Sequence, residues 1–182
     1  MTGVTCHDEL RPLLDAAREG DDHAVRELVR RTQPALWRLC TALGSSGEVD
    51  DLVQESYLRA FRSLPSYRGD APVQAWFLSI ARHVCADHVR RRTRQRRLFD
   101  RITQFQSTDL RDTSAPVQGD ALHQFVDRLT DDRREAFVLT QVVGLSYEEA
   151  AEVVGCPIGT IRSRVARARI DLLDALREAD AV

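Results

Sequence analysis

Apolar residues recur at steps of three and four along most of this chain, and the alternation of apolar and polar residues that is typical of strands is almost absent. This periodicity predicts helices over residues 9–20, 23–44, 45–65, 74–97, 121–130, 131–143, 145–155 and 156–173. Gly20 and Gly155 follow periodic runs and are expected to end helices in the left-handed conformation. Pro34 lies inside one run, where it should kink or divide the helix. The sequence therefore predicts an all-α protein.

Between residues 98 and 119 the periodicity is lost. The stretch QSTDLRDTSAPVQGD is polar and contains Pro116 and Gly119, as linkers commonly do. We therefore predict a helical domain over residues 1–97, a flexible linker over 98–119 and a second helical domain over 120–182. In the first domain, one face of the third helix should carry Val49, Leu52, Val53, Leu58 and Phe61.

The end of the chain predicts a helix-turn-helix. Thr130 can cap the first helix of this region, and Ser146 with Glu149 fits a capping box for the next. Pro157 is expected to open the last helix at its first position, after the stop at Gly155. A short helix, a tight turn and a longer helix are the spacing of helix-turn-helix motifs.

The last helix combines an apolar stripe with several arginines. Its core face is predicted to comprise Ile158, Ile161, Val165, Ala168, Leu172 and Leu176. Ser163, Ala166 and Arg167 lie on the opposite face, and Arg162 lies at its edge. Arg164 and Arg169 flank the stripe and can extend outward to phosphates. Such a face suits the major groove of DNA, although it also fits an ordinary solvated surface.

Composition limits how this basic face can be interpreted. The formal net charge is −2, so any nucleic-acid signal must be local. The chain contains no Lys, so every basic side chain other than His is Arg, as codon usage in a GC-rich genome would favour. Arg nevertheless has the planar fork that binds phosphate and guanine in a bidentate way.

The cysteines and histidines predict no metal site. Cys6, Cys40, Cys85 and Cys156 form no CxxC pair, which excludes a zinc ribbon and makes a disulfide framework improbable. His83, Cys85 and His88 are possible ligands by type, but His83 and His88 point apart on a helix, so we do not expect them to share a metal ion. We expect no cofactor. Unpaired cysteines, no signal-peptide pattern and no long apolar run predict a cytoplasmic protein without a membrane partner.

Two stretches resemble one known family. GLSYEEAAEVVGCPIGTIRSRVARAR is similar to the −35-binding domain of extracytoplasmic function (ECF) sigma factors of bacterial RNA polymerase. VDDLVQESYLRAFRSLPSYRGDAPVQAWFLSIARHVCADHVRRR resembles the polymerase-binding and −10-binding domain of the same family. Both motifs occur in the family's order. The resemblance implies a sigma factor that binds RNA polymerase core, recognises −10 and −35 promoter elements and directs initiation with promoter melting, without being an enzyme.

The resemblance also implies three sets of contact residues. The −35 DNA contacts would be Thr160, Arg162, Ser163, Arg164, Ala166, Arg167 and Arg169. The −10 DNA contacts would be Tyr67, Arg68, Gly69, Asp70, Ala71, Gln74, Arg82, His83, Asp87, Arg90 and Arg91. The polymerase contacts, on the clamp helices of the largest subunit, would be Asp50, Asp51, Leu52, Gln54, Glu55 and Tyr57. Another polymerase subunit would contact the C-terminal domain.

Family members capture a flipped −10 base in a loop, which here is YRGDAPVQAW. Unstacking a base costs a few kcal/mol, so the loop must stack on the base and bond to it. Trp76 and Phe77 are further candidates to line this site, but helical spacing favours core positions for both. The basic run RRRTRQRR that follows favours phosphate contact.

Some features of the resemblance are less direct. Asp109 and Asp112 give the linker an acidic character that family members use inside the polymerase, whereas a passive tether explains it equally well. Many relatives have a larger residue than Ala166, so the exact −35 contacts differ. Family members are often held inactive by an anti-sigma factor, which is a further partner that the resemblance allows.

Two other classes of protein share some of these features. A self-sufficient transcription regulator would use the same helix-turn-helix, commonly as a dimer on paired half-sites, but it would leave the first domain unexplained. An enzyme is disfavoured because Asp50 and Asp51 point about 100° apart on a helix and make a poor paired carboxylate site. No P-loop or nucleophile motif is present.

Overall fold

The computed structural model describes residues 8–44, 47–103 and 126–180. In these ranges the chain is helical and has no strand, which confirms the all-α prediction. The predicted linker residues Asp109 and Asp112, the helix start near residue 121 and Cys6 lie outside the described residues. None of the described helices has the length and apolar composition that a membrane crossing requires.

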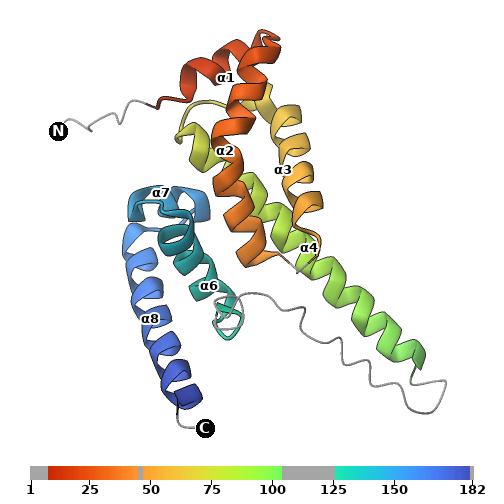
Figure 1. The fold of residues 1–182 in the computed structure, drawn as a ribbon, viewed down its shortest axis with the longest axis vertical. Coiled ribbons are helices and arrows are strands. Elements are labelled where there is room, and N and C mark those ends of the chain that lie inside the picture. Colours follow the sequence, from red (N-terminus) through yellow and green to blue (C-terminus); the bar gives the residue numbers. More distant parts are fainter. Residues whose placement is uncertain (1–7, 45–46, 104–125, 181–182) are drawn as a thin grey trace.

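The first domain consists of four helices packed around α2 (Figure 1). They are α1 (Arg11–Arg18), α2 (Asp22–Leu43), α3 (Val49–Ser63) and α4 (Val73–Thr103), with a short 3₁₀ turn at Leu64–Ser66. The core of α2 contains Leu28, Leu36 and Leu39, which are fully buried. The Asp21 carboxylate caps α2 by accepting hydrogen bonds from the amides of His23 and Ala24.

Several predicted features of this domain are changed in the structure. Helix α2 continues through Pro34 and is not divided there. Leu58, predicted on the apolar face of α3, is 44% exposed, because the buried face is formed by Leu52, Val53, Ser56 and Ala60. Helix α4 continues to Thr103, beyond residue 97 where the first domain was predicted to end.

The second domain contains α6 (Asp131–Phe137), a π-helical continuation η2 (Val138–Val143), α7 (Tyr147–Val154) and α8 (Ile158–Asp180). Gly144 and Gly155 end η2 and α7. Both adopt the left-handed conformation, with φ of 92° and 75°, which glycine reaches without steric cost. Ser146 and Glu149 form the predicted capping box. Thr130 occupies the N-cap position of α6 without a side-chain hydrogen bond.

Helix α8 differs from the prediction at both ends. It begins at Ile158, so Pro157 precedes the helix and its carbonyl accepts from the amides of Thr160 and Ile161. The predicted core residues Ile161, Val165 and Ala168 are buried, as expected. Leu176 is 43% exposed instead, because Ala175 continues the buried stripe at that level.

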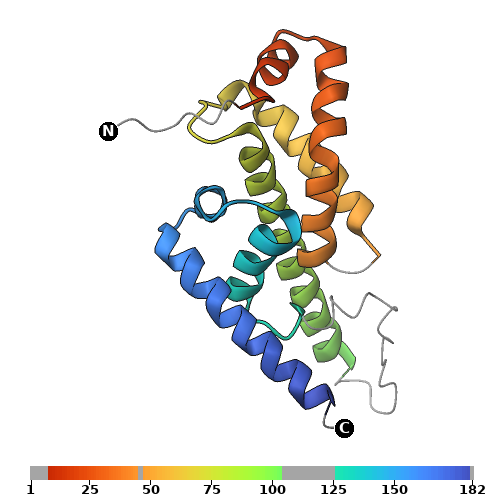
Figure 2. The same ribbon diagram turned by 60° about the vertical axis from the view of Figure 1, so that its left-hand side comes forward.

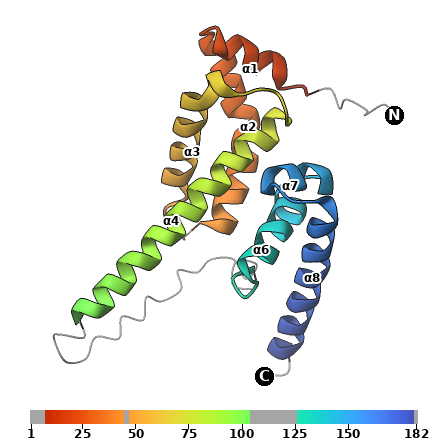
Figure 3. The same ribbon diagram turned by 180° about the vertical axis from the view of Figure 1, so that it is seen from behind.

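The two domains pack against each other. Helix α2 contacts η2, and α4 contacts α7. Figures 2 and 3 show, from two further sides, the second domain lying along α2 and the first half of α4. The Arg38 guanidinium donates a 3.5 Å hydrogen bond to the Val143 carbonyl across this contact. The described helices therefore form one connected body around a continuous apolar core.

Candidate functional site

The segment between α3 and α4 forms a compact loop around one tyrosine. Tyr67 is only 6% exposed, and its hydroxyl donates a 2.5 Å hydrogen bond to the Ala71 carbonyl. Its ring contacts the half-buried Trp76, with 5.1 Å between centroids, and Trp76 in turn contacts the buried Phe77. Tyr67 thus supports the loop from inside, and burial raises the pKa of its hydroxyl.

The other −10 candidates divide by exposure. Arg68, Gly69 and Asp70 form the exposed tip of the loop, and Ala71 and Gln74 are half-buried at its end. On α4, five further candidates follow the loop: the half-buried Arg82 and Asp87 and the exposed His83, Arg90 and Arg91. These α4 candidates do not share one face, because Arg82 pairs with Glu135 of α6 whereas Asp87 pairs with Arg59 of α3.

Asp87 links α3 to α4 through arginines. Its carboxylate accepts hydrogen bonds from Arg59 at 3.0 Å and from Arg90 at 2.8 Å. These two donors, Arg59 above all, lower the pKa of the Asp87 carboxyl. Arg59 also bonds to Glu55 at 2.7 Å. Asp87 is therefore bound to two cations in the free chain and holds Arg90 on its own helix.

Arg82 faces the second domain. Its Nη1 donates a 3.0 Å hydrogen bond to Glu135 of α6, and its Nη2 lies 3.1 Å from His83 Nε2. His83 Nδ1 lies 2.7 Å from the Ser79 carbonyl, so Nδ1 carries the hydrogen and Nε2 accepts from Arg82. Two predicted −10 contacts are therefore joined to a carboxylate of the helix-turn-helix domain.

The outward face of α3 carries part of the predicted polymerase set. Asp50, Asp51 and Gln54 are exposed and Glu55 is half-buried. Leu52 is buried in the core at 3% exposure, so it is not available to a partner.

Tyr57 is turned inward as well. Its hydroxyl shares a 2.8 Å hydrogen bond with Thr32 and lies 3.2 Å from the Val29 carbonyl. Leu58 was not among the predicted polymerase contacts, although it lies seven residues after Asp51 and is exposed on the same outward face. The seven-residue spacing from Asp51 was the sequence signal that could have placed Leu58 on the outward face.

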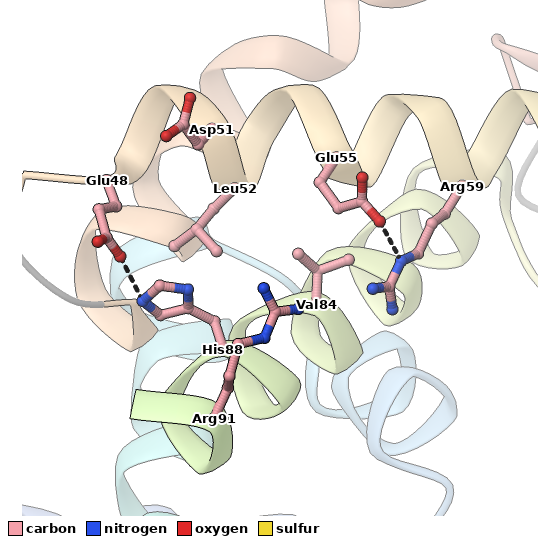
Figure 4. Close-up of a pocket in the computed structure, with 8 residues that line it drawn as sticks. All are labelled: Glu48, Asp51, Leu52, Glu55, Arg59, Val84, His88 and Arg91. Atoms are coloured by element: carbon pink, nitrogen blue, oxygen red, sulfur yellow. Dashed lines mark hydrogen bonds and ion pairs between the residues drawn. The ribbon is translucent and has the colours of Figure 1, made fainter. Parts of the chain in front are cut away.

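A cavity of about 420 Å³ lies between α3 and α4 (Figure 4). Its lining residues are Glu48, Asp51, Leu52, Glu55, Arg59, Val84, His88 and Arg91. At one end His88 Nε2 lies 2.5 Å from a Glu48 carboxylate oxygen. The cavity is therefore lined by both acidic and basic groups and borders the exposed carboxylates of α3.

Helix α8 presents its predicted recognition face to solvent. Arg162, Ser163, Ala166 and Arg167 are exposed, opposite the buried Ile161 side. Thr160 is half-buried, and its carbonyl accepts a 2.9 Å hydrogen bond from the Ser163 hydroxyl.

The two flanking arginines of α8 are bound within their own domain. Arg164 donates to Asp132 at 2.6 Å, and Arg169 donates to the Gln141 side chain at 3.0 Å. In the free chain they do not extend freely toward a phosphate, unlike the expectation from the sequence.

The structure brings together two cysteines that the sequence had left apart. The Cys85 thiol lies 3.8 Å from Cys40 Sγ, and both residues are buried. The hydrogen bond from Cys85 lowers the pKa of Cys40, and the same contact together with burial raises the pKa of Cys85. The described residues contain no group of three or more potential metal ligands.

Comparisons with known proteins agree with this arrangement. The model of sigma-70 region 2 matches residues 28–95, and that of sigma-70 region 4 matches residues 119–172. The ECF RNA polymerase sigma factor SigC of Mycobacterium tuberculosis is 41% identical over 176 residues, which cover 95% of both chains.

Solved structures give the same result. CnrH, in complex with the cytosolic domain of CnrY, superposes with a TM-score of 0.71 at 30% identity over 93% of this chain and 97% of that one. The sigma factor RpoE from Bartonella quintana, in complex with the anti-sigma factor NepR, gives 0.68 at 29% identity over 84% and 96%.

A two-domain helical fold that joins sigma region 2 to a region 4 helix-turn-helix defines an alternative sigma factor. The chain belongs to the ECF sigma factors of RNA polymerase. It is a promoter-recognising factor that directs transcription initiation, which confirms the resemblance and the function inferred from the sequence.

Proposed function

We propose that this sigma factor recognises the duplex −35 element with the exposed face of α8. The observation that carries the proposal is the solvent-facing position of Arg162, Ser163 and Arg167 on the second helix of a capped helix-turn-helix. Arginine can donate two hydrogen bonds to guanine O6 and N7 in the major groove, and each good pair discriminates by roughly 1–3 kcal/mol. Arg164 and Arg169 are assigned to phosphate contacts. They would form these contacts after their hydrogen bonds to Asp132 and Gln141 break.

The melted −10 strand is assigned to the loop tip and to exposed arginines of α4. Arg68, Gly69 and Asp70 are exposed, and the two side chains provide one positive and one negative charge. Arg90 and Arg91 lie farther along α4 in reach of a passing backbone. Tyr67 is assigned a supporting role, because its buried ring cannot stack on a base without leaving Trp76.

The outward face of α3 is assigned to polymerase core. Asp51, Gln54 and Leu58 give an apolar position within a polar and acidic surface, which suits a helix-on-helix contact. The residue set differs from the sequence prediction, since Leu58 takes the place of Leu52 and Tyr57. The chain would act on polymerase in the cytoplasm as a specificity subunit that contributes no catalytic group.

An anti-sigma factor is proposed as a further partner. RpoE from Bartonella quintana was crystallised with the anti-sigma factor NepR, and its fold is similar to that of this chain over most of its length. If a partner of this class exists, adding it to the factor with core polymerase should stop factor-dependent transcription. An excess of free sigma factor should restore transcription, because the inhibition is stoichiometric.

The test is multi-round transcription on a randomised promoter library with purified core polymerase. Core alone and core with this chain are compared. Transcripts that begin behind a shared two-part motif only when the chain is present support the proposal. If the chain binds duplex DNA alone but never directs initiation by core, it is a self-sufficient regulator and the proposal is wrong.

The assignment of α3 to polymerase binding is tested in the same assay with a double variant, Asp51→Ala combined with Leu58→Ala. We expect the affinity of this variant for core polymerase to fall about tenfold or more, because an interface depends mainly on a few central residues. The matched control is Asp131→Asn, which removes one exposed carboxylate from the other domain. Equal core affinity of the α3 variant and wild type would contradict the docking assignment.

A further inference from the structure

Three contacts join the N-terminal segment to the loop that is assigned to the −10 base. The Asp8 carboxylate accepts a 2.7 Å hydrogen bond from the Val73 amide, at the end of the loop where α4 begins. The Arg18 guanidinium donates to the Pro65 carbonyl at 3.2 Å, at the start of the loop. Between them, the Arg11 guanidinium lies over the Tyr67 ring, 5.2 Å from its centroid.

Arg11 also contacts the loop at Gly69. Gly69 has φ of +83°, and a Cβ atom built there would lie 2.2 Å from Arg11 Nη1. The guanidinium therefore packs directly against the glycine backbone. A side chain at position 69 would be strained and would also displace Arg11, so the loop tip is shaped around this one arginine.

Helix α1 is a firm support for Arg11. Leu10, Leu14 and Ala17 are buried against the core, which fixes the helix on the domain. Asp15 accepts from Arg11 Nε at 3.2 and 3.3 Å, one turn along the same helix. The hydrogen bond that Arg11 donates to Asp15 raises the pKa of Arg11, and the stacked guanidinium is a permanent cation, as arginine is in proteins.

These supporting residues lie outside the part of the chain that matches the family model. Sigma-70 region 2 matches residues 28–95, whereas Asp8, Arg11 and Arg18 precede residue 28. The shape of the loop in this chain therefore depends on a segment beyond the shared domain.

We infer that Asp8 and Arg11 are positioning residues for base capture, and that they hold the 67–71 loop in the shape that discriminates among −10 bases. This inference rests on the proposed assignment of that loop to the −10 element. A flipped base must recover its unstacking cost from contacts in the loop, and a loop ordered beforehand loses less entropy when the base enters. Without α1, the same loop side chains would be present but not held in place.

The experiment uses the full chain bound to core polymerase and single-stranded −10 oligonucleotides taken from the library-selected promoter. The measured quantity is the ratio of affinities for the selected base and for a substituted base. We expect Arg11→Met to lower this ratio about fivefold or more, since one wrong base in a specific site changes binding by such factors. Asp8→Ala should act in the same direction, and Arg11→Lys should fall between Arg11→Met and wild type because it keeps the charge without the planar group.

Arg26→Met is the matched control, because it removes one exposed charge from α2 of the same domain. Affinities for core and for −35 duplex are expected to remain at wild-type values in every variant. Hydrogen exchange of the amides at 68–71 should become faster only in the Asp8 and Arg11 variants. This readout separates loop release from a general loss of stability, which would accelerate exchange across α2 and α3 as well.

An unchanged affinity ratio in Arg11→Met and Asp8→Ala would overturn the inference, as would an equal loss in Arg26→Met. If Arg11→Met does not fold, Arg11→Lys decides in its place. A wild-type chain that shows no preference among −10 bases would instead refute the assignment of the loop, so the two failures are distinguishable.

Discussion

Arg82 of α4 and Glu135 of α6 form a 3.0 Å ion pair that joins the two domains, and their side chains are only 20% and 18% exposed. Arg82 belongs to the predicted −10 contacts, so in the free chain a carboxylate of the −35 domain occupies it. The Arg82 Nε is also buried without a hydrogen-bond partner among the described residues. A buried unsatisfied donor costs about 1–3 kcal/mol, which offsets part of what this contact contributes.

The first prediction is that Glu135→Gln increases binding of the free chain to single-stranded −10 DNA. Glutamine keeps an acceptor but loses the charge, which should weaken the contact by about 1 kcal/mol and raise affinity up to about fivefold. Fluorescence anisotropy with a labelled oligonucleotide measures the change. If core polymerase separates the two domains, the same substitution should have little effect in the complex.

Asp131→Asn is the control for this experiment, because Asp131 is an exposed carboxylate on the same helix. An equal gain in both variants would indicate general relief of charge repulsion with DNA. In that case the Arg82–Glu135 pair would have no role in covering the −10 surface.

A second prediction compares two arginines of α8. Arg162→Ala should relax base choice in the −35 element by roughly 1–3 kcal/mol, because an exposed guanidinium there can contact guanine. Arg164→Ala should leave base choice unchanged, since Arg164 is bound to Asp132 beside the apolar stripe. Affinities for a set of single-base −35 variants measure both. A loss of affinity in Arg162→Ala that is uniform over all sequences would contradict the base-reading role.

Local sequence features predicted the individual helices well. The capping box of Ser146 and Glu149 and the stop at Gly155 depend on residues within one helical turn, so their chemistry is visible in the sequence. The buried stripe of α8 follows for the same reason, because Ile161, Val165 and Ala168 have helical spacing.

Contacts between distant segments were not predictable in this way. Arg82 and Glu135 are 53 residues apart, and each resembles an ordinary charged residue on a helix surface. The positions of Leu52 and Tyr57 were misjudged, because the resemblance supplied a motif without the orientation of its helix in this fold. Leu58 was predicted on the apolar face of this helix, but it is 44% exposed, and its seven-residue spacing from Asp51 indicated the outward face.

A third prediction concerns stability at low pH. Hydrogen bonds from Arg30 and Arg31 lower the pKa of Glu27 from 4.5 to about 2. A carboxyl whose pKa is depressed by folding stabilises the native state above its unfolded pKa, and this stabilisation is lost as the pH falls toward the folded pKa. The difference in unfolding free energy between wild type and Glu27→Gln should therefore be constant above pH 4.5. It should shrink as the pH falls from 4.5 to about 2.

Chemical denaturation at a series of pH values measures this difference. Glu9→Gln is the control, because Glu9 is an exposed carboxylate with no ion pair among the described residues. If the difference between wild type and Glu27→Gln were the same at both ends of the pH range, the two arginines would not lower the pKa of Glu27.

The fourth prediction separates phosphate contact from base reading on α4. Arg91 is exposed beyond the loop, where a single strand leaving the capture site would pass. Arg91→Ala should weaken binding by a similar factor for all −10 sequences, because a phosphate carries no base identity. The slope of log affinity against log salt should fall by about 0.7, the value for one contact on a single strand. Arg26→Ala, which removes an exposed charge from α2, should leave the slope unchanged, and a changed base preference in Arg91→Ala would instead make Arg91 a base-reading residue.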